Sequence, residues 1–462
     1  MSMITSGSIK SLVGSVQDMY LRYPLPWVVG FSGGKDSTAV LQLVWAALKG
    51  IEPSKLTKPV YVLSSDTGVE NPLIKELIEE SILRINDAAA VEGLPIHAVC
   101  VQPEPEDGFW VNLIGRGYPA PTTRFRWCTE RLKIDPVSRF VRAKVAEFGE
   151  VIMVLGVRKE ESATRAQLMS AHEVQGHALR RHSTQTGAYV YAPIQDWSSD
   201  DVWAFLLQVQ SPWGSSNRDL SALYRSASGD ECPLVVDTST PSCGKSRFGC
   251  WVCTVASRDS SMASLVEDGQ LWLEPLLEFR DFLFDTTDPA KKRDYRDVRG
   301  RNGRIQVKRD GTLAARSYTL QTSKRMLADI LQIQTLMQRE RPEIELITHV
   351  ELQEVRRIWV YERHDWEDSL PAIVNAALGQ DAQWPEFDDL QFDLEYLEIL
   401  KSEAAGHGVP LALLTKLIEA ERATSLTGRR GIYKRIQKLV ELDWRSENEI
   451  LGAYSDYLEA NA

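Results

Sequence analysis

The chain has 462 residues, enough for two or three domains, and its 43% hydrophobic and 25% charged residues are typical of a globular protein. No apolar run reaches the ~18 residues needed to span a bilayer, and the N-terminus lacks the ordered basic, apolar and cleavage segments of a signal peptide, so we expect a cytoplasmic protein with no membrane role. The formal net charge of −11 excludes a general binder of nucleic acids, because non-specific binding depends on neutralising phosphates.

The first part of the chain, residues 26–210, alternates apolar strand patterns with helical patterns. This alternation predicts an α/β fold with a parallel sheet covered by helices on both faces. In such sheets ligands bind at the carboxyl ends of the strands, so the loops after the first, second and fourth strands are candidate sites. The expected strands are 26–31, 59–65, 95–101 and 151–156, and the expected helices are 37–49, 71–92 and 134–148.

The composition changes after this part. Residues 211–250 hold nine Ser, four Gly and three Pro with little periodicity, which indicates a long irregular segment. From about residue 262 onward, apolar residues recur at helical spacing. The helices expected there are 262–284, 318–340, 348–362, 388–404 and 430–446.

A glycine-rich loop, Ser32-Gly33-Gly34-Lys35-Asp36-Ser37, follows the first expected strand and leads into a helix. Successive backbone N–H groups at a helix N-terminus form an anion nest, to which Lys35 adds a positive charge and the serines add hydroxyl donors. Adjacent glycines let the backbone approach a pyrophosphate without a Cβ clash. The loop is not a Walker A loop, which has four residues between its glycines.

This hexapeptide resembles the PP-loop of the ATP pyrophosphatase family. The resemblance implies that the six loop residues bind ATP, that pyrophosphate leaves as a substrate oxygen is adenylated, and that Mg²⁺ lies near Asp36. It implies catalytic roles for Lys35, Asp36 and Arg158. The implied organisation is a PP-loop ATP pyrophosphatase domain (adenine nucleotide alpha hydrolase-like) over 1–210, a cysteine-rich cluster-binding segment over 211–260 and a mostly helical domain over 261–462.

Polar residues also follow the second and fourth expected strands. Asp66 and Thr67 lie where adenosine or Mg²⁺ would be held, although a helix N-cap would use the same residue types. Gly156, Arg158 and Glu161 follow the fourth strand. Arg158 can pair bidentately with phosphate and Glu161 can orient it, or the two can form a surface ion pair.

The segment 192–206, "APIQDWSSDDVWAFL", predicts a helix capped by Ser198 or Ser199. Together with the loop after the fourth strand it resembles signatures of the phosphoadenosine-phosphosulfate reductase branch of the PP-loop proteins. The Asp196-Trp197 pair can equally be architectural.

Five of the six cysteines gather in two places. Cys250 and Cys253 form a C-x-x-C motif that can chelate a metal, and no His lies at zinc-finger spacing, so four cysteines would hold either zinc or a [4Fe–4S] cluster. In the sulfonucleotide reductases a similar split set holds an iron–sulfur cluster, and a fifth cysteine could carry sulfur; scattered free thiols are the alternative. The candidate ligands are Cys128, Cys232, Cys243, Cys250 and Cys253.

Cys128 has four cations close in sequence, which favours its thiolate form. Cys100 ends an apolar strand pattern and is expected to fill the core. The four cations are Arg124, Arg126, Arg131 and Lys133.

Longer stretches resemble the DndC family of bacterial DNA phosphorothioation proteins: "PWVVGFSGGKDST", "KPVYVLSSDTGVENP", "RFRWCTERLKIDP", "VLGVRKEES" and "STPSCGKSRFGCWVCT". The resemblance runs from about residue 15 to 320. It implies an iron–sulfur ATP pyrophosphatase that activates the DNA backbone so that a non-bridging oxygen is replaced by sulfur, with a cysteine desulfurase and DndD- and DndE-like partners. The basic stretch 291–311, with nine Lys or Arg against three Asp, is a candidate DNA contact or a solvated connector.

Three other functions remain open at this stage. A sulfonucleotide reductase would use a C-terminal cysteine nucleophile, and no cysteine follows Cys253 in this sequence. A tRNA thiolase would need an RNA-binding module, and none is recognisable. An ATP-dependent scaffold subunit with a structural cluster would hydrolyse ATP without transferring sulfur.

Overall fold

The computed structural model describes residues 5–161, 179–227, 249–300, 304–379, 383–385, 394–425, 431–442 and 444–460. It divides into two compact units. The first consists of Met1–Phe109 and Pro121–Asp281, and the second of Trp110–Ala120 and Phe282–Ala462. The boundaries at residues 210 and 260 that the sequence suggested stay predictions. No helix in the described part of the chain is long and apolar enough to cross a membrane.

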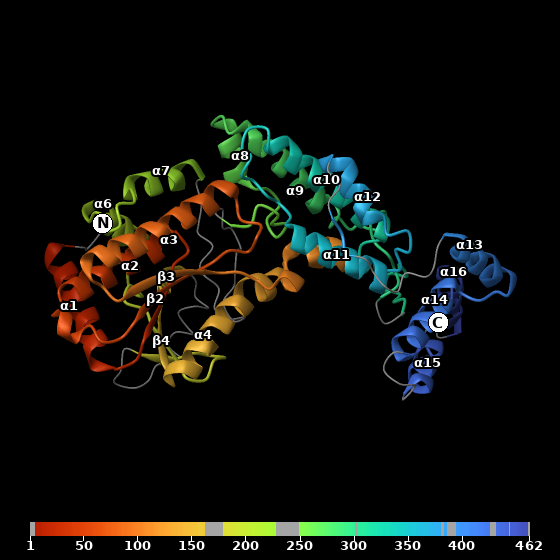
Figure 1. Cartoon of the computed structure of the whole chain (residues 1–462), viewed down its shortest axis with the longest axis horizontal. Coiled ribbons are helices and arrows are strands. Elements are labelled where there is room, and N and C mark those ends of the chain that lie inside the picture. Colours follow the sequence, from red (N-terminus) through yellow and green to blue (C-terminus); the bar gives the residue numbers. More distant parts are fainter. Residues whose placement is uncertain are drawn as a thin grey trace. The chain divides into compact units, whose positions relative to one another are not determined.

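The first unit is built on a six-stranded sheet with the order β3-β2-β1-β4-β6-β5 (Figure 1). All neighbours pair in parallel except β5 and β6, so the predicted α/β fold with a mostly parallel sheet is confirmed. The two short strands β5 and β6 were not predicted. The strands are β1 (Trp27–Gly30), β2 (Val60–Ser65), β3 (Ile96–Val101), β4 (Val151–Val154), β5 (Arg180–Arg181) and β6 (Ala188–Tyr191).

Helices cover both faces of this sheet. Alternate strand residues point to opposite faces, so Val29 packs with α2 on one side and Val28 packs with α4 on the other. Figure 1 shows α2 and α3 on one side of the strands and α4 on the other. The helices of this unit are α1 (Ser6–Arg22), α2 (Lys35–Lys49), α3 (Pro72–Glu92), α4 (Asp135–Phe148), α6 (Ser199–Gln208), α7 (Asn217–Ala227) and α8 (Ser260–Glu267), and α9 (Glu274–Asp285) runs to its end.

The second unit is helical. Its segment 110–120 packs among its helices, where the Trp110 indole donates to the Leu346 carbonyl at 2.6 Å and the Trp359 indole to the Ile114 carbonyl at 3.0 Å. The helices are α10 (Leu320–Met337), α11 (His349–Glu362), α12 (Ser369–Leu378), α13 (Leu394–Gly406), α14 (Leu411–Ser425), α15 (Ile432–Val440) and α16 (Glu447–Ala460).

Four sequence interpretations are wrong. Residues 211–250 are not irregular throughout, because α7 (Asn217–Ala227) lies within them, and the helix expected over 430–446 ends at Val440. The helix expected over 262–284 is two helices, because α8 ends before Gly269, whose φ of +99° is left-handed. Cys100 does not fill the core: β3 is the edge strand of the sheet, and the Cys100 side chain is exposed.

The strand order reverses next to β1. The chain runs from β1 outward through β2 to β3, and β4 then pairs on the opposite side of β1. Such a reversal separates the crossover helices and opens the crevice in which α/β proteins bind ligands. The loops after β1 and β4 therefore meet at the same edge of the sheet.

Gly156 brings these two loops into contact. A Cβ atom on Gly156 would lie 2.8 Å from the Asp36 carbonyl carbon and 2.9 Å from its oxygen. Both are backbone atoms of the first turn of α2, so this turn can approach the end of β4 only because residue 156 has no side chain.

We expect Gly156→Ala to lower the free energy of unfolding by about 1–3 kcal/mol, because the new methyl group displaces the backbone of α2. Urea denaturation measures this loss. Gly14→Ala is the matched control: a Cβ at Gly14 meets nothing within 4 Å, and alanine in a helix interior should leave stability equal or slightly higher. Equal effects of the two substitutions would contradict the proposed contact.

Candidate functional site

The loop after β1 has the shape of an anion nest. The Phe31 amide makes the last sheet hydrogen bond, to the Leu63 carbonyl at 2.9 Å, and Gly33 then turns left-handed with φ of +73°. Ser37 braces the loop, since its Oγ accepts from the Ser32 amide at 3.2 Å and donates to the Gly34 carbonyl at 3.0 Å. Helix α2 begins directly at Lys35, so its N-terminal amides lie at the loop.

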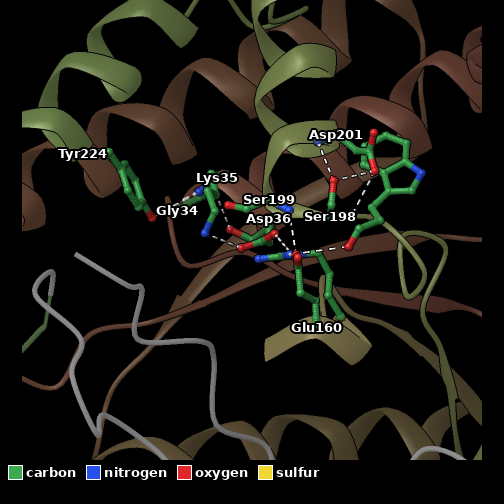
Figure 2. Close-up of polar contacts among 11 residues, drawn as sticks. Gly34, Lys35, Asp36, Glu160, Ser198, Ser199, Asp201 and Tyr224 are labelled. Atoms are coloured by element: carbon green, nitrogen blue, oxygen red, sulfur yellow. Dashed lines mark hydrogen bonds and ion pairs between the residues drawn. The ribbon is translucent and has the colours of Figure 1, made fainter. Parts of the chain in front are cut away.

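Three buried charges lie beside this nest (Figure 2). Asp36 is shared by two cations: its Oδ2 lies 3.0 Å from Lys35 Nζ and its Oδ1 lies 2.5 Å from Arg158 Nε. Each of the three residues is less than a tenth exposed. Two buried cations thus share one buried carboxylate beside the nest, and Arg158 has a further carboxylate partner in the exposed Glu160.

The same pairing bears on magnesium. Both carboxylate oxygens of Asp36 are engaged by cations. In this arrangement Asp36 orients Lys35 and Arg158, and Mg²⁺ near this carboxylate stays a prediction.

A second group of residues holds Arg158 in place (Figure 2). Its Nη1 lies 3.0 Å from Glu160 Oε2, and the same oxygen accepts from the Ser199 amide at 2.8 Å. Arg158 Nη1 also donates to the Trp197 carbonyl at 3.4 Å. Of the two caps that the sequence allowed for α6, the structure shows Ser198, in a capping box with Asp201. The 196–199 segment thus braces the arginine.

Among the described side chains, the carboxylates that contact Arg158 are therefore Asp36 and Glu160. The side chain of the adjacent Glu161 lies outside the described part, so its orienting role stays a prediction.

The loop after β2 is ordered by its own side chains. Asp66 accepts from the Gly68 amide at 2.8 Å and from Gln102 Nε2 at 2.9 Å. Asn71, not Asp66 or Thr67, caps α3, by accepting from the Leu73 amide at 3.0 Å. The alternative of a helix cap is thus wrong for Asp66 and Thr67, while their contact with a nucleotide stays a prediction.

The C-x-x-C motif packs against this same loop. Cys250 forms an antiparallel bridge with Glu70, and the Trp251 amide donates to the Val69 carbonyl at 3.0 Å. Thr67 Oγ1 lies 3.3 Å from Cys250 Sγ and donates to Glu70 Oε1 at 2.9 Å. One loop therefore joins a candidate nucleotide contact to a candidate sulfur site.

Cys128 lies half-buried in the same region, directly before a π-helical turn, Thr129–Ile134. Burial raises the pKa of the Cys128 thiol to about 11, and Lys133 opposes this rise. Of the four cations expected to favour the thiolate, Arg131 instead forms an ion pair with Asp107. Arg131 thus does not stabilise the Cys128 thiolate as expected. The rise in the Cys128 pKa caused by burial is larger than the opposing effect of Lys133.

Lys133 is a half-buried ammonium among acidic groups. Burial alone would lower its pKa, but Cys250, Glu70, Cys128 and Cys253 together raise it above the ordinary lysine value. Burial, and then the Glu70 carboxylate, raises the pKa of the Cys250 thiol. A permanent positive charge next to three cysteines suits a group held by thiolates.

Arg280, which is fully buried, fixes the backbone after the motif. Its Nε donates to the Cys253 carbonyl at 3.0 Å and its Nη1 to the Ser257 carbonyl at 3.0 Å. The turn that follows Cys253 is thereby held from α9.

The chemistry of these donors fits a thiolate-bound metal or cluster, with Cys128, Cys250 and Cys253 in one region beside Lys133. Cys232 and Cys243 lie outside the described residues. Within the described ranges, no three His, Cys, Asp or Glu side chains are already arranged as a metal site.

A family model for the phosphoadenosine phosphosulfate reductase domain matches residues 26–256, half of the chain. The chain belongs to this family. The match covers the phosphate loop, the Arg158 loop and the C-x-x-C motif, so the features described above lie within the family's domain.

Related proteins agree with the assignment. The chain is 26% identical over 182 residues to the adenosine 5'-phosphosulfate reductase of Allochromatium vinosum, covering 37% of this chain and 61% of that protein. It is 28% identical over 205 residues to an uncharacterized protein of Methanocaldococcus jannaschii, covering 44% of this chain and 36% of that protein. The chain thus spans less than two thirds of these relatives.

Among solved structures, the phosphoadenylyl-sulfate reductase of Candida auris shares 14% identity. The match covers 48% of this chain and 94% of that chain, with a TM-score of 0.28. This likeness is too low to add to the fold described above.

Asp36→Ala tests the charge arrangement of this reductase-family domain. The substitution leaves two buried cations without their shared carboxylate, so we expect the free energy of unfolding to fall by about 3 kcal/mol or more. Inorganic pyrophosphate should restore part of the loss, since it supplies the missing negative charge. Urea denaturation with and without pyrophosphate measures both effects.

Glu160→Gln is the control. The Glu160 side chain is 58% exposed, so its loss should cost less than about 1 kcal/mol. Two results would contradict the role of Asp36 as the shared partner of two buried cations. One is an equal loss of stability in both variants, and the other is no recovery of Asp36→Ala with pyrophosphate.

Proposed function

We propose that this protein is an ATP pyrophosphatase and sulfurtransferase of DNA phosphorothioate modification. The observation that carries the proposal is that one unit holds both a glycine-rich nest flanked by Lys35 and Arg158 and a C-x-x-C motif packed on the loop 66–71. Sulfur insertion by adenylation needs both: one centre that releases pyrophosphate, and another that handles sulfur. The choice of DNA rests on the long stretches that resemble the DndC family.

The proposed reaction begins at the phosphate loop. Its amides and Lys35 hold the pyrophosphate end of ATP, while Arg158 balances charge that develops as an oxygen of a DNA phosphate attacks the α-phosphorus. The bond from the α-phosphorus to the pyrophosphate breaks, and pyrophosphate leaves. Hydrosulfide, released from the donor's persulfide when an external thiol reductant cleaves the S–S bond, then bonds to the DNA phosphorus. The bond between this phosphorus and the adenylated oxygen breaks, and AMP departs with that oxygen.

The cysteines would hold the cofactor of this reaction. Cys128, Cys250, Cys253 and either Cys232 or Cys243 are the proposed ligands of a [4Fe–4S] cluster. When bound, such a cluster supplies one-electron transfer at a potential that nearby charges and hydrogen bonds adjust. The chain's own contribution is to bury the thiols partly, with Lys133 and the Thr67 hydroxyl close to them.

DNA would be bound with the help of other proteins. In the basic stretch 291–311, Lys291 pairs with Asp285 at 2.7 Å and Arg293 with Glu447 at 3.0 Å. Pairing of this kind reduces the charge offered to a DNA backbone. DndD- and DndE-like proteins as DNA-bound partners, and a cysteine desulfurase as sulfur donor, complete the proposal.

A sulfonucleotide reductase is the second candidate. The family match and the two reductase features of the sequence, the loop after β4 and the segment 192–206, favour it equally well at the level of the domain. The two candidates differ in substrate: the reductase would release sulfite from a phosphosulfate, whereas the proposed enzyme releases pyrophosphate from ATP.

The first test follows pyrophosphate and AMP released from ATP by the purified protein, with its partners and DNA present. Lys35→Ala should slow release by about a hundredfold, because a cation beside the leaving group is removed. Lys159→Ala is the control, since Lys159 forms an exposed pair with Asp196. Sulfite release from a phosphosulfate, without AMP formation from ATP, would replace the proposal with the reductase.

The second test concerns the cysteines. After anaerobic purification, we expect about four iron atoms and four sulfides per chain, with visible absorption. Cys250→Ala should abolish both, whereas Cys100→Ala, on the exposed edge strand, should change neither. Bound zinc in a colourless protein would contradict the cluster and leave the phosphate site untouched.

A further inference from the structure

A tyrosine from outside the recognised motifs lies at the phosphate loop. Tyr224, in α7, has its hydroxyl 3.4 Å from the backbone nitrogen of Lys35 and accepts its N–H (Figure 2). This amide is the first of α2, one of those that an anion at the helix N-terminus would use. The Tyr224 ring also lies 5.4 Å from Lys35 Nζ, within cation–π distance.

The position of Tyr224 is fixed by two contacts. Its ring packs edge-on against Trp203 in α6 with the centroids 5.2 Å apart. At the start of α7, Asn217 Oδ1 accepts from Gln42 Nε2 of α2 at 3.0 Å, and Asn217 Nδ2 donates to the Leu206 and Val209 carbonyls at 2.8 Å each. Helix α7 is therefore tied both to α2 and to the end of α6, which places the phenol at the loop.

We propose that Tyr224 is a phosphate ligand of this site, with a phenol that donates its proton to the pyrophosphate end of the nucleotide. The geometry allows this without movement of the helix. An oxygen about 2.9 Å from an amide nitrogen and about 2.7 Å from a hydroxyl forms a triangle with two atoms that are 3.4 Å apart. One phosphate oxygen can thus accept from the Lys35 amide and the Tyr224 hydroxyl together.

The chemistry of the phenol supports this role. A hydroxyl that accepts one hydrogen bond still carries a proton to donate, and a donor to phosphate makes a charge-assisted bond. The ring meanwhile stays beside the Lys35 ammonium. The inference rests on the proposed binding of a pyrophosphate group at the loop, and it adds α7 to the elements that form the site.

The test compares the affinity of the full-length protein for inorganic pyrophosphate by isothermal titration calorimetry. We expect Tyr224→Phe to raise Kd about tenfold, since a charge-assisted hydrogen bond is lost while the ring remains. Tyr224→Ala should weaken binding further, because the ring beside Lys35 is lost as well. ATP should show the same order of affinities.

Tyr189→Phe is the matched control. It removes a phenol of β6 that donates to the Glu150 carboxylate at 2.8 Å, and should leave the pyrophosphate Kd unchanged. Thermal unfolding without ligand checks that the Tyr224→Phe protein is as stable as the Tyr189→Phe protein.

The outcomes separate the two proposals. If the unmodified protein fails to bind pyrophosphate, the proposed function fails first. If it binds and Tyr224→Phe binds equally well, the inference alone is overturned. Tighter binding by Tyr224→Phe would also overturn it, and would identify the hydroxyl as a competitor for the Lys35 amide.

Discussion

The carboxylate of Asp36 links the two loops on which this site depends. It pairs with Lys35 from its own loop and with Arg158 from the loop after β4. The two loops beside the strand reversal at β1 are therefore held together by ion pairs as well as by backbone contact. All three side chains are buried. If either cation turned toward water, the Asp36 carboxylate would lose one of its two ion pairs. The arrangement holds two cations in a fixed geometry before any ligand arrives, which reduces the reorganisation that binding would otherwise require.

The loop after β2 is held at both of its ends by hydrogen bonds. Asp66 is held by Gly68 and Gln102, and a few residues later Glu70 pairs with the backbone of Cys250. A displacement at either end must therefore strain the other. The half-buried Lys133 adds an electrostatic reason for the cysteines to stay together, since its charge is stabilised by the same groups. Phosphate chemistry and sulfur chemistry thus share a short, well-ordered piece of chain.

Most of the fold of the first unit could be predicted from local patterns in the sequence. The strands β1 to β4 and the phosphate loop were predictable because each is specified by neighbouring residues: an apolar run, two glycines and a helix start. Glu70 and Tyr224 could not be chosen from sequence, since their roles come from contacts with residues far along the chain, as in the 189-residue separation of Tyr224 and Lys35. Cys100 was misassigned because an apolar run does not reveal whether a strand lies at the edge of a sheet. Helices such as α12 and α16 lacked a clear apolar stripe.

The charge of the whole chain and the charges at the site act on a ligand over different distances. A net charge of −11 is spread over a surface much larger than the Debye length of about 8 Å at physiological salt. The two cations at Asp36 are buried and act at contact distance in a medium of lower dielectric constant. The net charge of the chain therefore says little about the potential that a compact anion would meet at the loop.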